Sequence, residues 1–341
     1  MIRSRQPGFR FAAGALVLVF VVVILGAWTR LADAGLGCPD WPGCYGFAGI
    51  PMSEERIALA EMRFPDAPVE VDKAWPEMIH RYFAGALGLV ILGLAVQAWR
   101  RRDEPDRPLL LPLALVAVVA VQAAFGAWTV TLKLWPQIVV AHLLGGFLTL
   151  SLLGLLWLRL GWKRPAVSGA MAGVFRRLRP LAVAGLVLLV VQIAIGGWVS
   201  ANYAALACPD FPTCQGVWWP EADFAHGFNV LQEVGPNYLG GLMYSEGRIA
   251  IHLTHRIGAI FVALALGVLA WKLAMTPRAW HLRPLGLTLA GVLLLQILLG
   301  IANVVFSLPL LVATAHNAVG AGLLLTMVAV NHRVRATATH I

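Results

Sequence analysis

Eight apolar runs, each about as long as a helix that crosses a membrane, constrain this chain more than any other feature of its sequence. Of its 341 residues, 59% are hydrophobic and only 13% are charged, and the apolar residues collect in these runs. We place membrane-spanning helices near residues 12–29, 78–99, 108–131, 137–160, 180–199, 248–271, 284–306 and 309–331. The sequence therefore predicts an all-α integral membrane protein. The first run belongs to a repeat and no small-residue cleavage site follows it, so we do not interpret it as a signal peptide.

The basic residues lie in alternate segments between these runs. The net charge is +9, and 18 of the 26 Lys and Arg fall at the two ends of the chain and in the loops after the second, fourth and sixth runs. Because basic loops mark the cytoplasmic side of a membrane, both termini are predicted to be cytoplasmic. The basic clusters are expected to meet anionic headgroups of the lipid bilayer, so no nucleic acid partner is predicted.

An internal repeat explains most of this layout. Cys38-Pro-Asp-Trp-Pro-Gly-Cys44 recurs 170 residues later as Cys208-Pro-Asp-Phe-Pro-Thr-Cys214, and Gln122-Ala-Ala-Phe-Gly126 recurs 174 residues later as Gln296-Ile-Leu-Leu-Gly300. Each copy holds an even number of runs, so the copies share one orientation and should be related by a pseudo-two-fold axis along the membrane normal. The fold class is thus two tandem four-helix bundles.

The repeat also sets the predicted boundaries. Residues 1–162 form the N-terminal half, 163–179 a cytoplasmic linker, and 180–341 the C-terminal half. The long outer loops, about 31–77 and 200–247, are rich in Pro, Gly and Trp, and we expect them to form short helices or caps over the bundle.

The four cysteines form two pairs on the predicted outer side, Cys38 with Cys44 and Cys208 with Cys214. An oxidising compartment favours disulfides, whereas a zinc site would need four ligands at closer spacings. The small loop closed by Cys38 and Cys44 leaves open whether that disulfide is structural or redox-active.

Four histidines belong to the repeat, two in each half. His80 and His255 open the second and sixth runs, and His142 and His316 lie early in the fourth and eighth. All four enter from the outer side, so the members of each pair lie at similar depth, as two axial ligands of one haem iron must. A lone membrane histidine is as readily explained by an interhelical hydrogen bond, but four in register favour two haem sites.

Small and cationic residues accompany these histidines. Arg81 and Arg256 follow a histidine in each half, and a guanidinium suits a haem propionate, although snorkelling to the interface is the simpler alternative. Small residues could leave room where the edge of a macrocycle approaches the backbone, and these are Gly145, Gly146, Gly320 and Gly322.

One acidic residue breaks the symmetry between the halves. Glu77 lies three residues before His80 on the same helix face, whereas the repeat carries His252 at that place. A carboxylate at the edge of a membrane is costly and is a functional candidate; the alternative is a solvated carboxylate that suits the start of a helix. A di-iron site would need a second Glu-x-x-His and further carboxylates, which this chain lacks.

Taken together, these features resemble the haem A synthases over nearly the whole chain: eight spans, a duplicated four-helix unit, paired outer-loop cysteines, and Glu-x-x-His-Arg at the second helix. The resemblance implies an enzyme that converts haem O to haem A by oxidising the C8 methyl to a formyl group, through two hydroxylations and loss of water. It implies that His80 and His142 bracket the substrate haem, that His255 and His316 ligate a permanent haem b, and that Glu77 is the catalytic carboxylate.

The resemblance also implies a setting. The expected partners are haem O synthase, cytochrome oxidase assembly factors and an unidentified electron donor, in a bacterial cytoplasmic (inner) membrane. Outward-facing aromatic side chains could serve a homo-oligomer interface.

Two other functions fit part of the sequence. A di-haem b cytochrome passing electrons from a quinone would explain the histidines, but not why only one half carries Glu77. A transporter with parallel repeats would need polar or broken helices at mid-membrane. Polar residues there are sparse, chiefly Gln122, Gln192 and Gln296.

Overall fold

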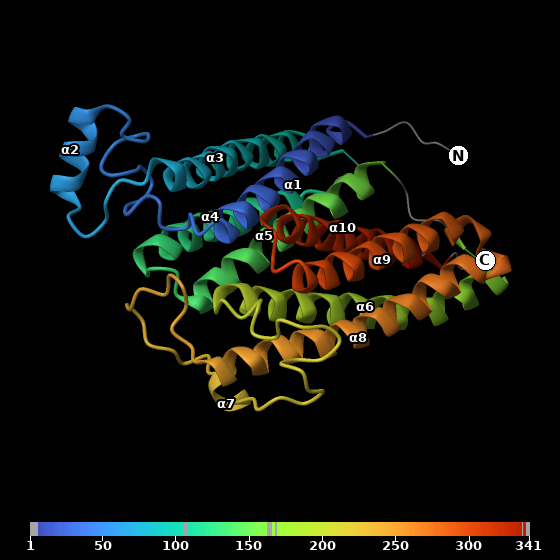
Figure 1. Ribbon diagram of the computed structural model, residues 1–341. Coiled ribbons are helices and arrows are strands. Elements are labelled where there is room, and N and C mark those ends of the chain that lie inside the picture. Colours follow the sequence, from blue (N-terminus) through green and yellow to red (C-terminus); the bar gives the residue numbers. More distant parts are fainter. Residues whose placement is uncertain (1–5, 105–107, 162–165, 168, 336, 339–341) are drawn as a thin grey trace.

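The computed structural model describes residues 6–104, 108–161, 166–167, 169–335 and 337–338. Within these residues, eight helices are long and apolar enough to cross a membrane, which confirms the predicted number. They pack side by side in one elongated bundle (Figure 1). The helices are α1 (Phe9–Leu31), α3 (Val71–Arg100), α4 (Leu110–Thr131), α5 (Pro136–Gly161), α6 (Gly169–Ala201), α8 (Ser245–Met275), α9 (Arg283–Val305) and α10 (Leu310–Val334).

The all-α prediction is confirmed apart from one short pairing. The two-residue strands β1 (Ala166–Val167) and β2 (Thr337–Ala338) pair in parallel, and they are the only strands in the part of the chain that the structure describes.

Large apolar side chains cover the outer surface of the bundle. Leu89, Leu110 and Leu264 are 72%, 81% and 62% exposed. Water would penalise such a surface, whereas the apolar chains of lipid would not. The helices also satisfy their backbone hydrogen bonds internally, as a bilayer requires. The exposure pattern therefore agrees with a protein that lies in a bilayer.

The two halves share one apolar core. α10 packs against both α1 and α5, and α5 also packs against α6. Buried residues from both halves form one cluster, which includes Leu150 and Leu153 of α5, Leu266 of α8 and Met327 of α10. The division into halves at 162 and 180 stays a prediction from the repeat.

Both long loops lie at one end of the bundle, opposite the start of α1 and the end of α10 (Figure 1). They contain the short helices α2 (Glu54–Arg63) and α7 (Phe224–Gly227), as the sequence predicted. The Ser53 side chain accepts the Arg56 N–H at 3.4 Å, and two glutamates occupy the first turn of α2; both features stabilise a helix start.

The fifth spanning helix begins earlier than the predicted residue 180, so that much of the predicted linker 163–179 is helical. α6 begins at Gly169, so its basic segment is helical, and Pro180 lies inside the helix instead of starting it. Phe175 and Leu178 are buried in the common core, which extends the helix beyond the apolar run. Residues 162–165 and 168 lie outside the described residues. The 3₁₀ helix η1 (Pro277–Leu282) connects α8 to α9.

Candidate functional site

In the N-terminal half, His80 and His142 form a facing pair. Their ring centroids lie 6.3 Å apart with an interplanar angle of 80°. Two imidazoles that each bond one metal at about 2.0 Å place their ring centres about 6 Å apart. The pair is therefore spaced as two axial ligands of one iron would be.

A glycine from a neighbouring helix stands against each of these imidazoles. A Cβ added at Gly26 would lie 2.9 Å from His80 Nε2, and one added at Gly126 would lie 3.5 Å from His142 Cε1. A side chain at Gly26 would therefore push against the His80 ring.

The C-terminal half repeats this arrangement with His255 and His316. A Cβ added at Gly196 would lie 3.0 Å from His255 Cε1, and one at Gly300 would lie 3.1 Å from His316 Cε1. The four glycines were not predicted to face the histidines, but the signal was present in the sequence. Gly26 and Gly196 share the offset of 170, and Gly126 and Gly300 share the offset of 174.

Two glutamines hold the second pair of rings. Gln192 Nε2 lies 3.1 Å from His255 Nδ1 and also donates to the His255 carbonyl at 2.8 Å, while Gln296 Nε2 lies 3.2 Å from His316 Nε2.

The Nδ1 atoms of His142 and His316 are buried without a hydrogen-bond partner. Because buried polar atoms are nearly always paired, these nitrogens fit a bond to a ligand that the protein itself does not supply.

The glycines that the sequence suggested have other neighbours. A Cβ at Gly145 would collide with the Gln122 amide, and one at Gly320 would lie 3.4 Å from Gln296 Nε2. Gly146 and Gly322 face open space, so their role beside a macrocycle stays a prediction.

The histidines also lie further along their helices than predicted. His80 and His255 do not open their helices, because α3 begins at Val71 and α8 begins at Ser245. Each lies between two and three turns from its helix start, at 3.6 residues per turn.

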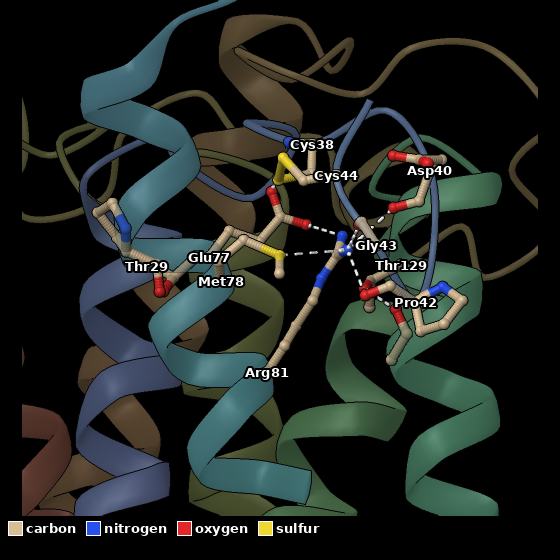
Figure 2. A network of polar contacts seen from close by, with 12 residues as sticks. Thr29, Cys38, Asp40, Pro42, Gly43, Cys44, Glu77, Met78, Arg81 and Thr129 are labelled. Carbon is tan, nitrogen blue, oxygen red and sulfur yellow. Dashed lines mark hydrogen bonds and ion pairs between the residues drawn. A yellow bond between two sulfur atoms is a disulfide. The ribbon is translucent and has the colours of Figure 1, made fainter. Parts of the chain in front are cut away.

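Glu77 is the centre of a buried polar network beneath the first cysteine loop (Figure 2). Its side chain is on α3 and the residue is only 5% exposed. Oε2 accepts the Cys38 N–H at 3.0 Å, and Oε1 pairs with the Arg81 guanidinium at 2.5 Å. The alternative of a solvated carboxylate at a helix start is therefore wrong, since Glu77 is buried, paired and inside α3.

His252 occupies the equivalent place in the second half. Its Nδ1 lies 3.3 Å from the Cys208 amide nitrogen, and its Nε2 lies 3.2 Å from Arg256 Nε. A carboxylate can accept both donors, whereas a neutral imidazole accepts at one nitrogen only. Glu77 and His252 thus share a structural role as anchors of the cysteine loop, but only Glu77 brings a negative charge.

Both predicted disulfides are present. Cys38 and Cys44 are joined with their Cα atoms 4.8 Å apart, and Cys208 and Cys214 with theirs 4.6 Å apart. No free cysteine occurs among the described residues. These pairs give the two cysteine loops, residues 38–44 and 208–214, the same local geometry.

An aspartate organises each cysteine loop. Asp40 accepts the amide N–H groups of Tyr45 and Gly46, and Asp210 accepts those of Gln215 and Gly216. The pKa of Asp210 is lowered, first by a hydrogen bond from the Thr213 hydroxyl and then by these amides.

The two arginines predicted to meet propionates are already engaged by the cysteine loops. Arg81 Nη1 donates to the carbonyls of Asp40 at 2.9 Å and Gly43 at 2.5 Å. Arg256 donates to three carbonyls of the second loop, at distances of 2.7 to 2.8 Å, and these belong to Cys208, Asp210 and Thr213. Both side chains therefore clamp a loop onto its helix (Figure 2 shows the first).

An open, mainly apolar pocket of about 280 Å³ lies between α4 and α5. The second of these helices, α5, also carries His142. Gln122 and Gly145 line it together with Phe125 and Leu148. Among the described residues, no group of three or more His, Cys, Asp and Glu is placed to hold a metal ion.

The chain matches one protein family and several known proteins. A family model described as Cytochrome oxidase assembly protein (COX15-CtaA) matches residues 9–328. The Heme A synthase of Shewanella oneidensis is 46% identical over 317 residues, which cover 93% of each chain. The Heme A synthase of Rhizorhabdus wittichii is 31% identical and covers 93% of this chain and 90% of its own. That of Maricaulis maris is 29% identical, covering 92% and 91%.

Proposed function

This chain belongs to the COX15-CtaA family of cytochrome oxidase assembly proteins, and from that premise we propose that it is a haem A synthase, an oxidoreductase that converts haem O to haem A. The reaction oxidises the C8 methyl of the porphyrin to a formyl group through two hydroxylations and loss of water. The observation that carries the proposal is the His80–His142 pair, whose ring centroids are 6.3 Å apart, in a chain that matches a Heme A synthase over 93% of its length.

The two histidine pairs take different haems. His80 and His142 hold the substrate, because only their half carries the buried carboxylate of Glu77. His255 and His316 hold a haem b, supported by the buried Nδ1 of His316, which lacks a partner, and by the glutamines that fix both rings. When bound, that haem supplies electron transfer.

The protein contributes orientation and charge to the substrate site. Two imidazoles fix the plane of the substrate, and Gly26 and Gly126 keep their rings unobstructed. Glu77 places a fixed negative charge one turn before His80, held by Arg81 and the Cys38 amide. A fixed charge in a site that excludes water can stabilise positive charge that develops as the methyl group is oxidised.

The orientation in the membrane follows from the charges of the loops. We place both termini in the cytoplasm and the cysteine loops on the outer face of a bacterial cytoplasmic membrane, since basic residues dominate the opposite end. The product then serves cytochrome oxidase assembly, in keeping with the family description.

Pigment analysis of the purified protein tests the proposal. Haem extracts from cells that supply haem O should contain haems B, O and A together. Haem B alone would favour the di-haem b cytochrome, and absence of all haem would favour the transporter.

A further inference from the structure

The outer end of the C-terminal half contains an open pocket of about 580 Å³ that borders the second cysteine loop. Its wall comes from the segment after α6 and from the start of α8. The polar groups that line it are those of Tyr203, Gln215, Ser245 and Arg248, and Met243 and Pro209 contribute apolar surface.

Two polar atoms of this pocket are buried without a hydrogen-bond partner, Arg248 Nε and the Tyr203 hydroxyl. Arg248 Nη2 makes only long contacts with the carbonyls of Gly240 and Gly241, at 3.3 and 3.2 Å. None of the ion pairs found in the described part of the chain includes Arg248. Because buried polar groups are nearly always satisfied, these two donors suit an anionic ligand.

A second arginine, Arg30, lies against Tyr203 and pairs with Asp33 at 3.7 Å. The Arg30 guanidinium carbon lies 4.1 Å from the centre of the Tyr203 ring, and Arg30 Nη2 donates to the Ser200 carbonyl at 2.6 Å. Arg248 and Tyr203 are themselves close, since a Cβ added at Gly241 would meet Arg248 Nη2 at 3.1 Å and Tyr203 Cδ2 at 3.2 Å.

The position of this pocket relative to His255 identifies the anion. Arg248 precedes His255 by seven residues on α8, so it lies about 10 Å outward and faces nearly the same direction. Tyr203 comes seven residues after Gly196, which is the glycine that faces His255. Arg248 therefore lies at about the distance that a propionate arm spans from an iron bound at His255, and Tyr203 lies beside Arg248. Arg256, in contrast, is engaged by the second cysteine loop.

We propose that Arg248 and Tyr203 bind a carboxylate, namely a propionate of the haem that His255 and His316 hold. This inference rests on the haem b site of the proposed function. The N-terminal half carries Lys73 at the equivalent place, seven residues before His80, but Lys73 pairs with Glu70 at 2.5 Å, so among the described residues only the C-terminal half has an arginine without an ion pair there.

Haem titration tests the carboxylate site. The full-length chain is purified from haem-deficient cells as a His80→Ala variant, so that only the C-terminal pair binds, and is titrated with iron protoporphyrin IX or its dimethyl ester while the Soret band is followed. Arg248→Gln should weaken binding of the diacid by about ten- to a hundredfold, as for loss of a charge-assisted hydrogen bond, and leave the ester unchanged. Tyr203→Phe should weaken the diacid less. Arg56→Gln, an exposed arginine of α2, is the matched control and should change neither.

The outcomes separate this site from the haem site itself. If Arg248→Gln changes neither haem, or both equally, the carboxylate assignment is overturned while the haem site stands. If the parent protein binds neither haem, the haem b site and the carboxylate site both fall. If native mass spectrometry instead finds an anionic phospholipid that Arg248→Gln loses, with the haem preference unchanged, the pocket binds a phosphate and the proposal is wrong.

Discussion

Replacing Glu77 with glutamine tests whether its negative charge acts in the conversion of haem O or only anchors the cysteine loop. The carboxylate accepts two donors, the Cys38 amide at 3.0 Å and Arg81 at 2.5 Å. Glutamine offers one acceptor oxygen, so one of these donors would face an amide NH₂ group. Breaking a buried pair costs about 3–5 kcal/mol, and we expect the lower end because Arg81 keeps its loop carbonyls.

The effect on conversion should remain after the loss of folded protein has been corrected for. If the charge stabilises the reaction, Glu77→Gln should lower haem A formation per haem-loaded protein by about 10²–10³-fold, with haem O or a hydroxylated intermediate accumulating. Haem binding should survive, because none of the four histidines is altered. The assay is pigment composition in cells that supply haem O, normalised to folded protein.

The second half of the protein supplies matched controls. Glu77→His copies the arrangement at His252, so it should anchor the loop through one nitrogen and still stall conversion. His252→Gln should lower the unfolding temperature as the Glu77 variants do, yet keep the ratio of haem A to haem O near that of the parent protein. Parental haem A levels in both Glu77 variants would refute a catalytic role and leave Glu77 as a loop anchor alone.

Three further outcomes follow from the structure. Mass spectrometry without reduction should find both cysteine pairs joined in protein from intact membranes, and four free thiols would contradict an oxidising outer side. His255→Ala or His316→Ala should lose haem B, since each removes one axial bond; full retention in both would place that haem elsewhere. Gly26→Ala should weaken substrate haem binding by displacing His80, whereas Gly14→Ala on the same helix, where no atom lies within 4 Å of the added Cβ, should bind haem normally; equal binding by the two variants would remove the steric argument.

The sequence by itself determined the elements and their order. Apolar runs predict spanning helices because lipid demands about 20 apolar residues and internal backbone bonding. The 170-residue and 174-residue offsets also align the cysteines and histidines of the two halves, and both predicted disulfides are present. The sequence did not reveal where α6 begins, because burial of Phe175 and Leu178 in the common core extends this helix through a basic segment.

Only the tertiary structure decided what each side chain contacts. Glu77 is an anchored, buried carboxylate because the cysteine loop folds back onto α3, a contact across 39 residues that no local pattern encodes. The same folding back engages Arg81 and Arg256 with loop carbonyls, and it leaves Arg248 and Tyr203 with unpaired donors in a pocket. Helical periodicity fixes which face a residue occupies, but the partner on that face depends on how helices and loops distant in sequence pack together.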